Sequence, residues 1–249
     1  MASILDRYGI KEVADVTFYD IVVDNKGMST MGAPVLYLDT LKVSTIETTA
    51  ENVSARGGKG NPELVTWDYG KEITVTLEDA LFSAKSMAIM FGALDASGKT
   101  VVGSSADIYK TVPAALVENG SVSLNGTWVS IPNDASYYMA NGDTGTSTSY
   151  DYVTFKVTTG ATKVINISAA TFPGTYYIQG DTYSRSDVTG ADQFFQFIIP
   201  KAKMSAENTI TLEAEGDPAT FSMNLTVLRP ESGEMMKLVQ YDLQDPSAG

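Results

Sequence analysis

The sequence contains no cysteine and no histidine. The chain therefore cannot form disulfides, thiol nucleophiles, Ser-His-Asp triads or zinc sites with thiolate or imidazole ligands. A pair of carboxylates or a lysine could still take part in catalysis, but no pattern in the sequence frames either one. We therefore predict that the protein is not an enzyme and binds no cofactor and no metal ion.

Positive charge and long apolar runs are also scarce. There are 17 Lys and Arg residues against 30 Asp and Glu residues, which gives a net charge of −13. Such a surface repels phosphate backbones, so tight nucleic-acid binding is not expected. No stretch approaches the roughly 20 apolar residues that span a bilayer, and Asp6 and Arg7 interrupt any N-terminal signal segment. We expect a protein that is soluble where it is made and has no membrane partner.

What the sequence does contain is alternation of apolar and polar residues with period two. Within residues 71–77, Ile73, Val75 and Leu77 share one face and Glu72 lies on the other, which predicts a half-buried strand. Further strands are predicted at residues 16–23, 35–46, 152–157, 163–167, 175–178, 194–199, 208–214 and 220–227.

Two turn signals join some of these strands. Residues 216–219, Gly-Asp-Pro-Ala, would connect the last two strands as a hairpin. Asn125-Gly126 supplies the positive φ angles of a type I′ turn, which predicts a second hairpin in the middle of the chain.

A single segment has the periodicity of a helix. Asp79 is suited to its N-cap and Gly92 to its C-terminal end. The apolar stripe consists of Leu81, Ala84, Ala88 and Phe91, widened by Phe82 and Ile89. We therefore expect a mainly β fold, a sandwich or barrel with one flanking helix.

Ser, Thr, Gly, Asn and Tyr crowd together in the middle of the chain. We interpret residues 98–171 as an inserted outer lobe of short strands and long loops, and residues 1–97 with 172–249 as the β core with its terminal arms. The alternative is that the middle forms the irregular half of one sandwich.

Two glycine-rich segments have the composition of phosphate-binding loops. Such a loop needs Gly-x-x-x-x-Gly-Lys-Ser/Thr between a strand and a helix, so that backbone N–H groups and the helix N-terminus converge on the anion. Residues 56–61, RGGKGN, are followed by a proline and a strand, and residues 92–100 have the wrong spacing and follow a helix. We expect neither segment to bind a nucleotide.

Residues 56–61 then have two interpretations. One is a flexible surface loop. The other is a docking loop, in which glycines permit close backbone approach and two cations attract an acidic copy of the same chain. The residues concerned are Arg56, Gly57, Gly58, Lys59, Gly60 and Asn61.

The predicted elements follow a definite order along the chain: a long strand, an exposed Gly/Lys loop, a hairpin at residues 63–77, one helix and a variable middle. With the motifs RGGKGN, LVTWDYGK, LEDALFS, EAEGDPATF and VLRP, this order resembles the major tail tube proteins of long-tailed bacteriophages. The resemblance covers residues 35–91 and 192–241.

The resemblance implies a β-sandwich with a flanking helix, whose copies form stacked hexameric rings around a common inner barrel. Residues 46–63 would correspond to a long loop that reaches the next ring, which makes residues 56–61 an inter-ring contact. The terminal arms, residues 1–10 and 234–246, would tie subunits together. The apolar residues of the second arm are Met235, Met236, Leu238, Val239 and Tyr241.

Closure of sheets between copies would supply hydrogen-bond partners to the edges of long strands. Since DNA carries one charge per ~1.7 Å, an acidic bore would let a genome pass without gripping it. The candidates to line the bore are Glu72, Glu213 and Glu215; a solvated strand face is the simpler interpretation of the last two. The resemblance further implies other tail proteins as partners (a tape-measure protein, a terminator and, in a contractile tail, a sheath). It implies a place in the virion tail after synthesis in the host cytoplasm.

Two other classes of protein remain open. One is a different β-sandwich virion protein, such as a capsid decoration or baseplate protein. The other is a carbohydrate-binding adhesin domain, in which Tyr137, Tyr138, Tyr150 and Tyr152 would be stacking platforms.

Overall fold

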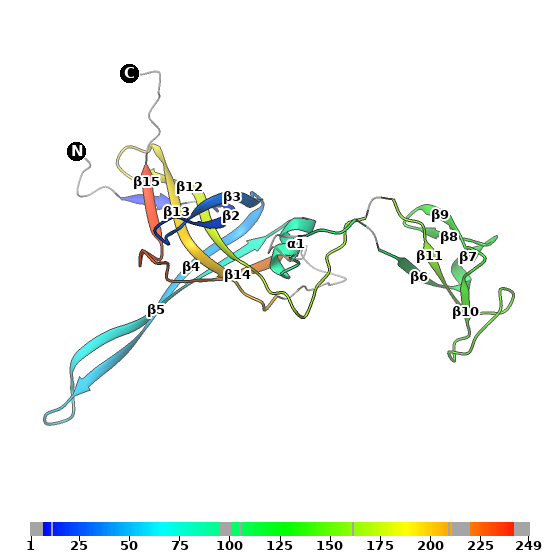
Figure 1. Ribbon diagram of the computed structural model, residues 1–249, viewed down its shortest axis with the longest axis horizontal. Coiled ribbons are helices and arrows are strands. Elements are labelled where there is room, and N and C mark those ends of the chain that lie inside the picture. Colours follow the sequence, from blue (N-terminus) through cyan, green and yellow to red (C-terminus); the bar gives the residue numbers. More distant parts are fainter. Residues whose placement is uncertain are drawn as a thin grey trace, which may run out of the picture. The chain divides into compact units, whose positions relative to one another are not determined.

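A computed structural model of the chain describes residues 7–10, 12–94, 101–104, 106–160, 162–208, 210 and 220–241. Within them the protein is mainly β with one short α-helix (Figure 1), which confirms the predicted fold class. The chain divides into two compact units, Met1–Val101 with Ile165–Gly249 and Val102–Val164.

The larger unit is built on one antiparallel sheet. The strands follow the order β3-β2-β12-β13-β14-β5-β4, with β1 added beside β12 and β15 beside β13. They are β1 Tyr8–Ile10, β2 Asp15–Val23, β3 Ser29–Leu38, β4 Leu41–Arg56, β5 Glu63–Asp79, β12 Thr175–Ser186, β13 Asp192–Met204, β14 Phe221–Val227 and β15 Lys237–Tyr241. β3 and β4 are at opposite ends of this order, yet only Asp39 and Thr40 separate them in the chain. The sheet must therefore curl enough to bring the end of β3 near the start of β4.

Period-two alternation gives this sheet one buried face. Along β12 every second residue from Tyr176 to Ser186 is buried, and in β5 Ile73, Val75 and Leu77 are buried, as the sequence predicted. The side chains of the core that are almost completely buried are Val16, Phe18, Val75, Leu77, Ile89, Met90, Ile178, Ile199, Met204, Met223 and Leu225.

Gly180 determines how the core packs between β12 and β13. It lies directly opposite Phe197 in the antiparallel ladder. A Cβ at this position would lie 2.1 Å from the Phe197 ring, so the buried ring rests on the space that a side chain would fill. The glycine is required here by close packing rather than by its backbone conformation.

The helix α1 spans Ala84–Met90 and packs Ile89 and Met90 into the core. Its N-cap is Ser83, whose hydroxyl accepts from the Ser86 N–H while the Ser86 hydroxyl accepts from the Ser83 N–H. This reciprocal pair is a capping box. At the other end Gly92 has φ 66° and its N–H donates to Ile89 O at 3.2 Å, while the Ala93 N–H donates to Ala88 O at 2.8 Å. This is a Schellman-type turn, so the predicted C-terminal end is confirmed.

The predicted N-cap, in contrast, is wrong. Asp79 is the last residue of β5, and its carboxylate accepts from the Thr40 hydroxyl at 2.5 Å and from the Leu81 N–H at 3.2 Å. Leu81 and Phe82 precede the helix and are exposed, so they are not part of a buried helical stripe.

Several strand predictions also need correction. Residues 35–46 are two strands, since the chain turns at Asp39–Thr40. Residues 63–77 are not a hairpin but part of the single strand β5. Gly70 has φ 63° and lies where β5 has two residues opposite one of β4, so the chain forms a β-bulge there instead of a turn. Residues 163–167 form no strand, because Val164 bridges to Gly103 without further pairing. The strand predicted at 208–214 and its turn at 216–219 lie almost wholly outside the described residues.

The smaller unit contains two three-stranded antiparallel sheets, β10-β11-β6 and β7-β8-β9. They enclose Val112, Val122, Val153 and Phe155. Asn125 and Gly126 have φ angles of 48° and 80°, which confirms the predicted turn between β8 and β9. The elements are β6 Ile108–Pro113, a 3₁₀ turn Ala114–Leu116, β7 Val117–Glu118, β8 Ser121–Leu124, β9 Thr127–Ser130, β10 Ser136–Tyr138 and β11 Tyr152–Val157.

Candidate assembly surfaces

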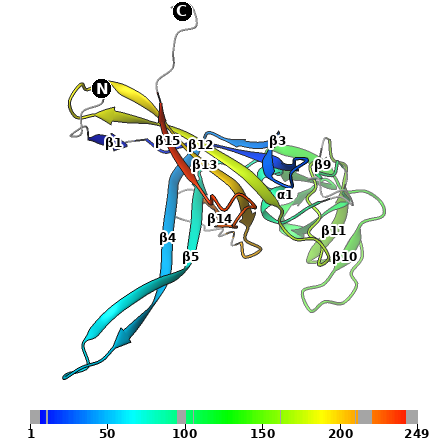
Figure 2. The ribbon, with the colours of Figure 1, turned by 60° about the vertical axis from the view of Figure 1, so that its left-hand side comes forward.

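The β4–β5 hairpin continues well beyond the core of the larger unit (Figures 1 and 2). The pairing with buried side chains ends at Thr48 and Ile73. From there to the tip nearly all side chains of both strands are exposed. The predicted loop at residues 46–63 is therefore strand almost throughout, and the connecting loop is confined to residues 57–62.

The register of this hairpin separates its side chains into two faces. Val53 lies opposite Trp67, Ala55 opposite Val65, and Tyr69 opposite Glu51. Directly opposed residues share a face of an antiparallel pair. We call the set Val53, Ala55, Val65, Trp67 and Tyr69 the apolar hairpin face; Glu51 lies at its core-side end, opposite Tyr69. The other side, the polar hairpin face, carries Asn52, Ser54, Arg56, Glu63, Thr66 and Asp68.

The apolar hairpin face is open to solvent in the single chain. Val53, Val65, Trp67 and Tyr69 are exposed to 54%, 48%, 55% and 53%. A contiguous apolar surface of this kind marks a contact site, and a two-stranded ribbon without a third element is marginally stable in water. Contact with another chain would therefore add both burial and order to the hairpin.

The tip loop explains the glycines of residues 56–61. Gly57 N–H donates to Pro62 O at 3.2 Å and closes the loop. Gly58 and Gly60 have φ angles of 85° and 89°, which side chains rarely adopt. A Cβ at either position would meet nothing within 4 Å in this chain. Backbone conformation therefore accounts for these two glycines.

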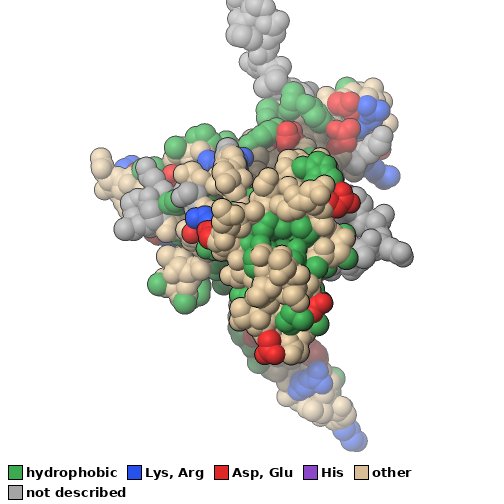
Figure 3. All heavy atoms as spheres, turned by 90° about the vertical axis from the view of Figure 1, so that its right-hand side faces the viewer, with side chains coloured by type: hydrophobic (Ala, Val, Ile, Leu, Met, Phe, Trp, Pro, Cys, Tyr) green, Lys and Arg blue, Asp and Glu red, His purple; other side chains and the backbone are tan. Residues whose placement is uncertain are grey.

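The two cations at the tip differ in their surroundings. Arg56 pairs with Glu63 at 3.1 Å. Glu63 also accepts hydrogen bonds from the hydroxyls of Ser54 and Thr66, and these bonds lower the pKa of Glu63. Lys59 has no ion pair within the described part of the chain. It is therefore the cation left to face an acidic partner, and Figure 3 shows basic side chains at the far end of the hairpin.

Two strands of the large sheet have an edge without a partner in the described part of the chain. β4 pairs with β5 alone and β3 with β2 alone. The edge of β4 runs over 16 residues and that of β3 over 10. Unpaired edges of this length offer backbone N–H and C=O groups to a strand of another chain.

Glu72 lies on the face of the sheet that points away from the core. It is paired with Thr49, and the same face carries Glu47, opposite Thr74, and Glu78, opposite Ser222. Period-two alternation along β5 from Glu72 would have predicted that Glu78 lies on the same face. The position of Glu47 on this face follows from the register between β4 and β5, which the sequence of one strand does not contain. The other two candidates for the bore, Glu213 and Glu215, lie outside the described residues.

The C-terminal arm is partly accounted for by contacts within the chain. Lys237–Tyr241 forms β15 and pairs with β13, and the Tyr241 ring stacks on Phe194 at 5.4 Å. Met235 and Met236 pack against the core. Leu238 is exposed to 58% and faces solvent. Contact of this arm with another subunit stays a prediction.

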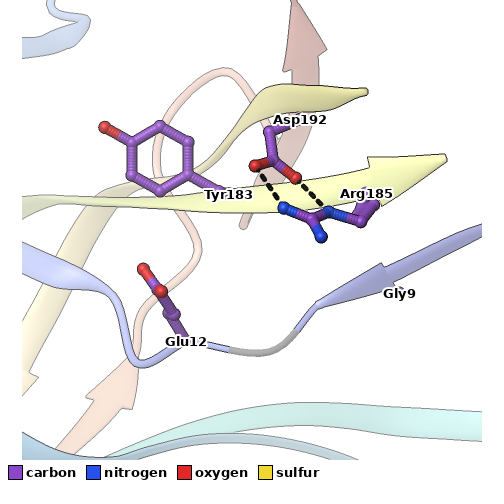
Figure 4. Close-up of a pocket in the computed structure, with 5 residues that line it drawn as sticks. All are labelled: Gly9, Glu12, Tyr183, Arg185 and Asp192. Atoms are coloured by element: carbon purple, nitrogen blue, oxygen red, sulfur yellow. Dashed lines mark hydrogen bonds and ion pairs between the residues drawn. The ribbon is translucent and has the colours of Figure 1, made fainter. Parts of the chain in front are cut away.

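A pocket of about 390 Å³ lies beside β1 and the β12–β13 hairpin (Figure 4). The Arg185 guanidinium donates two hydrogen bonds to the Asp192 carboxylate, from Nε at 2.6 Å and from Nη2 at 2.7 Å. This ion pair lowers the pKa of Asp192, the opposite of what a general acid needs. Glu12, Tyr183 and Gly9 complete the lining. The arrangement supports strand pairing and offers no catalytic pair.

Within the described ranges no group of acidic residues could hold a metal ion. In the same part of the chain, no helix has the length and apolar character needed to cross a membrane.

The described part of the chain thus combines an exposed amphipathic hairpin, two unpaired strand edges and a buried β core, and these surfaces are suited to contact with other chains. Over residues 8–240 the sequence matches the YomU/Tube protein family. The chain belongs to this family, a family of phage tail tube proteins. No curated protein matched the sequence.

Proposed function

We propose that the protein is the subunit of a phage tail tube, in which six copies form a ring and the rings stack into a passive conduit for DNA. Membership of the tube family is the coarse basis for this function. The observation that carries the finer proposal is the apolar hairpin face of β4 and β5, whose large side chains stay exposed in the described part of the chain.

In the proposed assembly the apolar hairpin face lies against another copy in the adjacent ring. The tip loop, from Arg56 to Asn61, enters an acidic surface of that copy, where Lys59 pairs with carboxylates; among the described residues of its own chain it has no such partner. The hairpin and its receptor are different surfaces of one molecule, so the contact is head-to-tail and can propagate. Such a contact builds stacked rings rather than a closed dimer.

Within a ring, the open edges of β3 and β4 would pair with neighbouring copies and close the sheets into a barrel. The face that bears Glu47, Glu72 and Glu78 would then line the bore. Its carboxylates repel the phosphates of DNA, which carries one charge per ~1.7 Å. DNA would pass without specific binding.

The remaining expectations belong to the same proposal. The residues of the inserted lobe, 98–171, would lie outside the tube, because a lobe in the bore would obstruct DNA. The C-terminal arm, with Leu238 exposed, would contact a neighbouring subunit. The tube would meet a tape-measure protein, a terminator and, in a contractile tail, a sheath, and its place would be the virion tail. We assign it no enzymatic activity, in line with the structural role of the family.

Electron microscopy of the concentrated full-length protein tests this proposal. Stacked rings of six subunits with an open bore are the expected particles. A homogeneous preparation of compact monomers or trimers at every concentration, and no such tubes in virions, would refute it.

A further inference from the structure

The four tyrosines that could act as stacking platforms separate into two pairs in the smaller unit. Tyr137 and Tyr150 pack edge-to-face with ring centroids 4.8 Å apart and lie against the small core. Tyr138 and Tyr152 lie directly opposite each other on β10 and β11 and are exposed to 40% and 43%. The first pair is structural, and the second is available to a ligand.

Tyr109 joins the exposed pair on the same side of the sheet. It is exposed to 62% and lies opposite Lys156, four residues along β11 from Tyr152. At about 3.3 Å per residue, Tyr152 and Lys156 lie roughly 13 Å apart along β11, and Tyr109 lies beside Lys156 on the neighbouring strand. We call the outward side of this sheet the tyrosine face; it carries Tyr109, Thr111, Tyr138, Tyr152, Thr154 and Lys156, with Ser136 opposite Thr154 and Pro113 opposite Tyr152.

Hydroxyl groups lie between the aromatic rings of this face. The hydroxyls of Thr111 and Thr154 are 2.8 Å apart and belong to opposed residues of β6 and β11. Hydroxyls both donate and accept hydrogen bonds. A surface that presents both tyrosine rings and hydroxyls suits a ligand with apolar C–H faces and polar edges.

The charge of the tyrosine face narrows the class of ligand. Lys156 is the charged residue of this face among the residues that the structure describes. Its Nζ lies 2.6 Å from the Asp107 carboxylate, which neutralises its charge. The face is therefore matched to an uncharged partner, in contrast to the acidic chain as a whole.

We infer that the tyrosine face binds a neutral polysaccharide, with Tyr138 and Tyr152 stacking on one sugar ring and Tyr109 on another along the same glycan chain. The separation of the tyrosines fits several linked sugars better than one. This binding function does not require the proposed tube, because the whole tyrosine face lies within the smaller unit of a single chain.

Affinity electrophoresis of the full-length protein tests the inference. Native gels are cast with galactomannan, xyloglucan or hydroxyethylcellulose as neutral probes and with polygalacturonate as the charged comparison. Retardation by at least one neutral polysaccharide is expected. The double variant Tyr138→Ala/Tyr152→Ala should bind about tenfold more weakly or worse, as expected for the loss of aromatic anchors.

Two control variants separate recognition from folding. Trp128→Ala removes another exposed aromatic of the same unit, on β9 in the other sheet, and should leave binding unchanged. Tyr138→Phe/Tyr152→Phe keeps the rings and should retain most of the affinity. Binding to no neutral probe, or an equal loss in the Trp128 variant, would overturn the inference. So would a loss of self-association instead of glycan binding in the tyrosine variant, since the face would then be a protein interface. Tubes formed by the Tyr138→Ala/Tyr152→Ala variant together with lost glycan binding would support the inference and leave the proposed function unaffected.

Discussion

Replacement of Trp67 by alanine is expected to weaken self-association more than any other single truncation on the hairpin. Trp67 lies at the middle of the apolar hairpin face, opposite Val53, and is the largest side chain there. Buried tryptophans at the centre of an interface commonly dominate its affinity.

The expected magnitude follows from the exposed area. A tryptophan side chain offers about 250 Å², of which 55% is exposed in the single chain, so roughly 140 Å² would leave water on docking. At about 25 cal/mol per Å² this area contributes about 3 kcal/mol per contact. The dissociation constant of one hairpin contact should therefore rise by about 100-fold.

Sedimentation velocity over a range of concentrations measures this change. Asn52→Ala is the matched control, because it truncates an exposed residue of the same hairpin on the polar hairpin face. Its association should match that of the wild type. Thermal unfolding should differ little between the two variants, since neither position belongs to the core.

The reasoning would be refuted if Trp67→Ala assembled with wild-type affinity. An equal loss in Asn52→Ala would also refute it, because the two faces of the hairpin would then not differ in their contribution.

Three further predictions concern single positions. Gly180→Ala should lower the free energy of unfolding in urea by about 1–3 kcal/mol, because its Cβ would press on the Phe197 ring, whereas Gly9→Ala, with open space around it, should change it little; equal effects would contradict this account of the core. Glu63 should titrate in NMR with a pKa below the ordinary glutamate value. The contribution of its hydrogen bonds to the stability of the hairpin is therefore present above that ordinary pKa and is lost as the pH falls through the lowered pKa. An unshifted titration would argue against these bonds. Lys59→Glu should slow association and reduce its dependence on salt, and an unchanged rate at low salt would remove the charge argument for the tip.

Strand alternation and turn chemistry predicted much of the fold. Ile73, Val75 and Leu77 identified the buried face of β5, and Asn125-Gly126 identified the β8–β9 turn, because both signals depend on local backbone geometry. The same locality limited the helix, since Asp79 and Ser83 are both capable caps. In the structure Asp79 ends β5 and accepts from Thr40 of another segment, while Ser83 forms the capping box with Ser86.

The apolar hairpin face was not predicted, although part of its signal is present. Val65, Trp67 and Tyr69 alternate with polar residues, but residues 63–77 are predicted as a hairpin, whereas they belong to one strand with a bulge at Gly70. Pairing of Val53 with Trp67 depends on the register between two strands, which no single segment contains. The tip residues were identified from their glycines and charges, whereas the larger contact surface lies in the strands behind them.

Hydrogen–deuterium exchange of the β4 backbone amides, compared between dissociated and assembled protein, tests most directly whether copies cover this hairpin and its open edge. Our account predicts that amides between Leu41 and Arg56 become strongly protected on assembly while those of β10 and β11 do not change. Exchange in β4 that is equally fast in both states would contradict it.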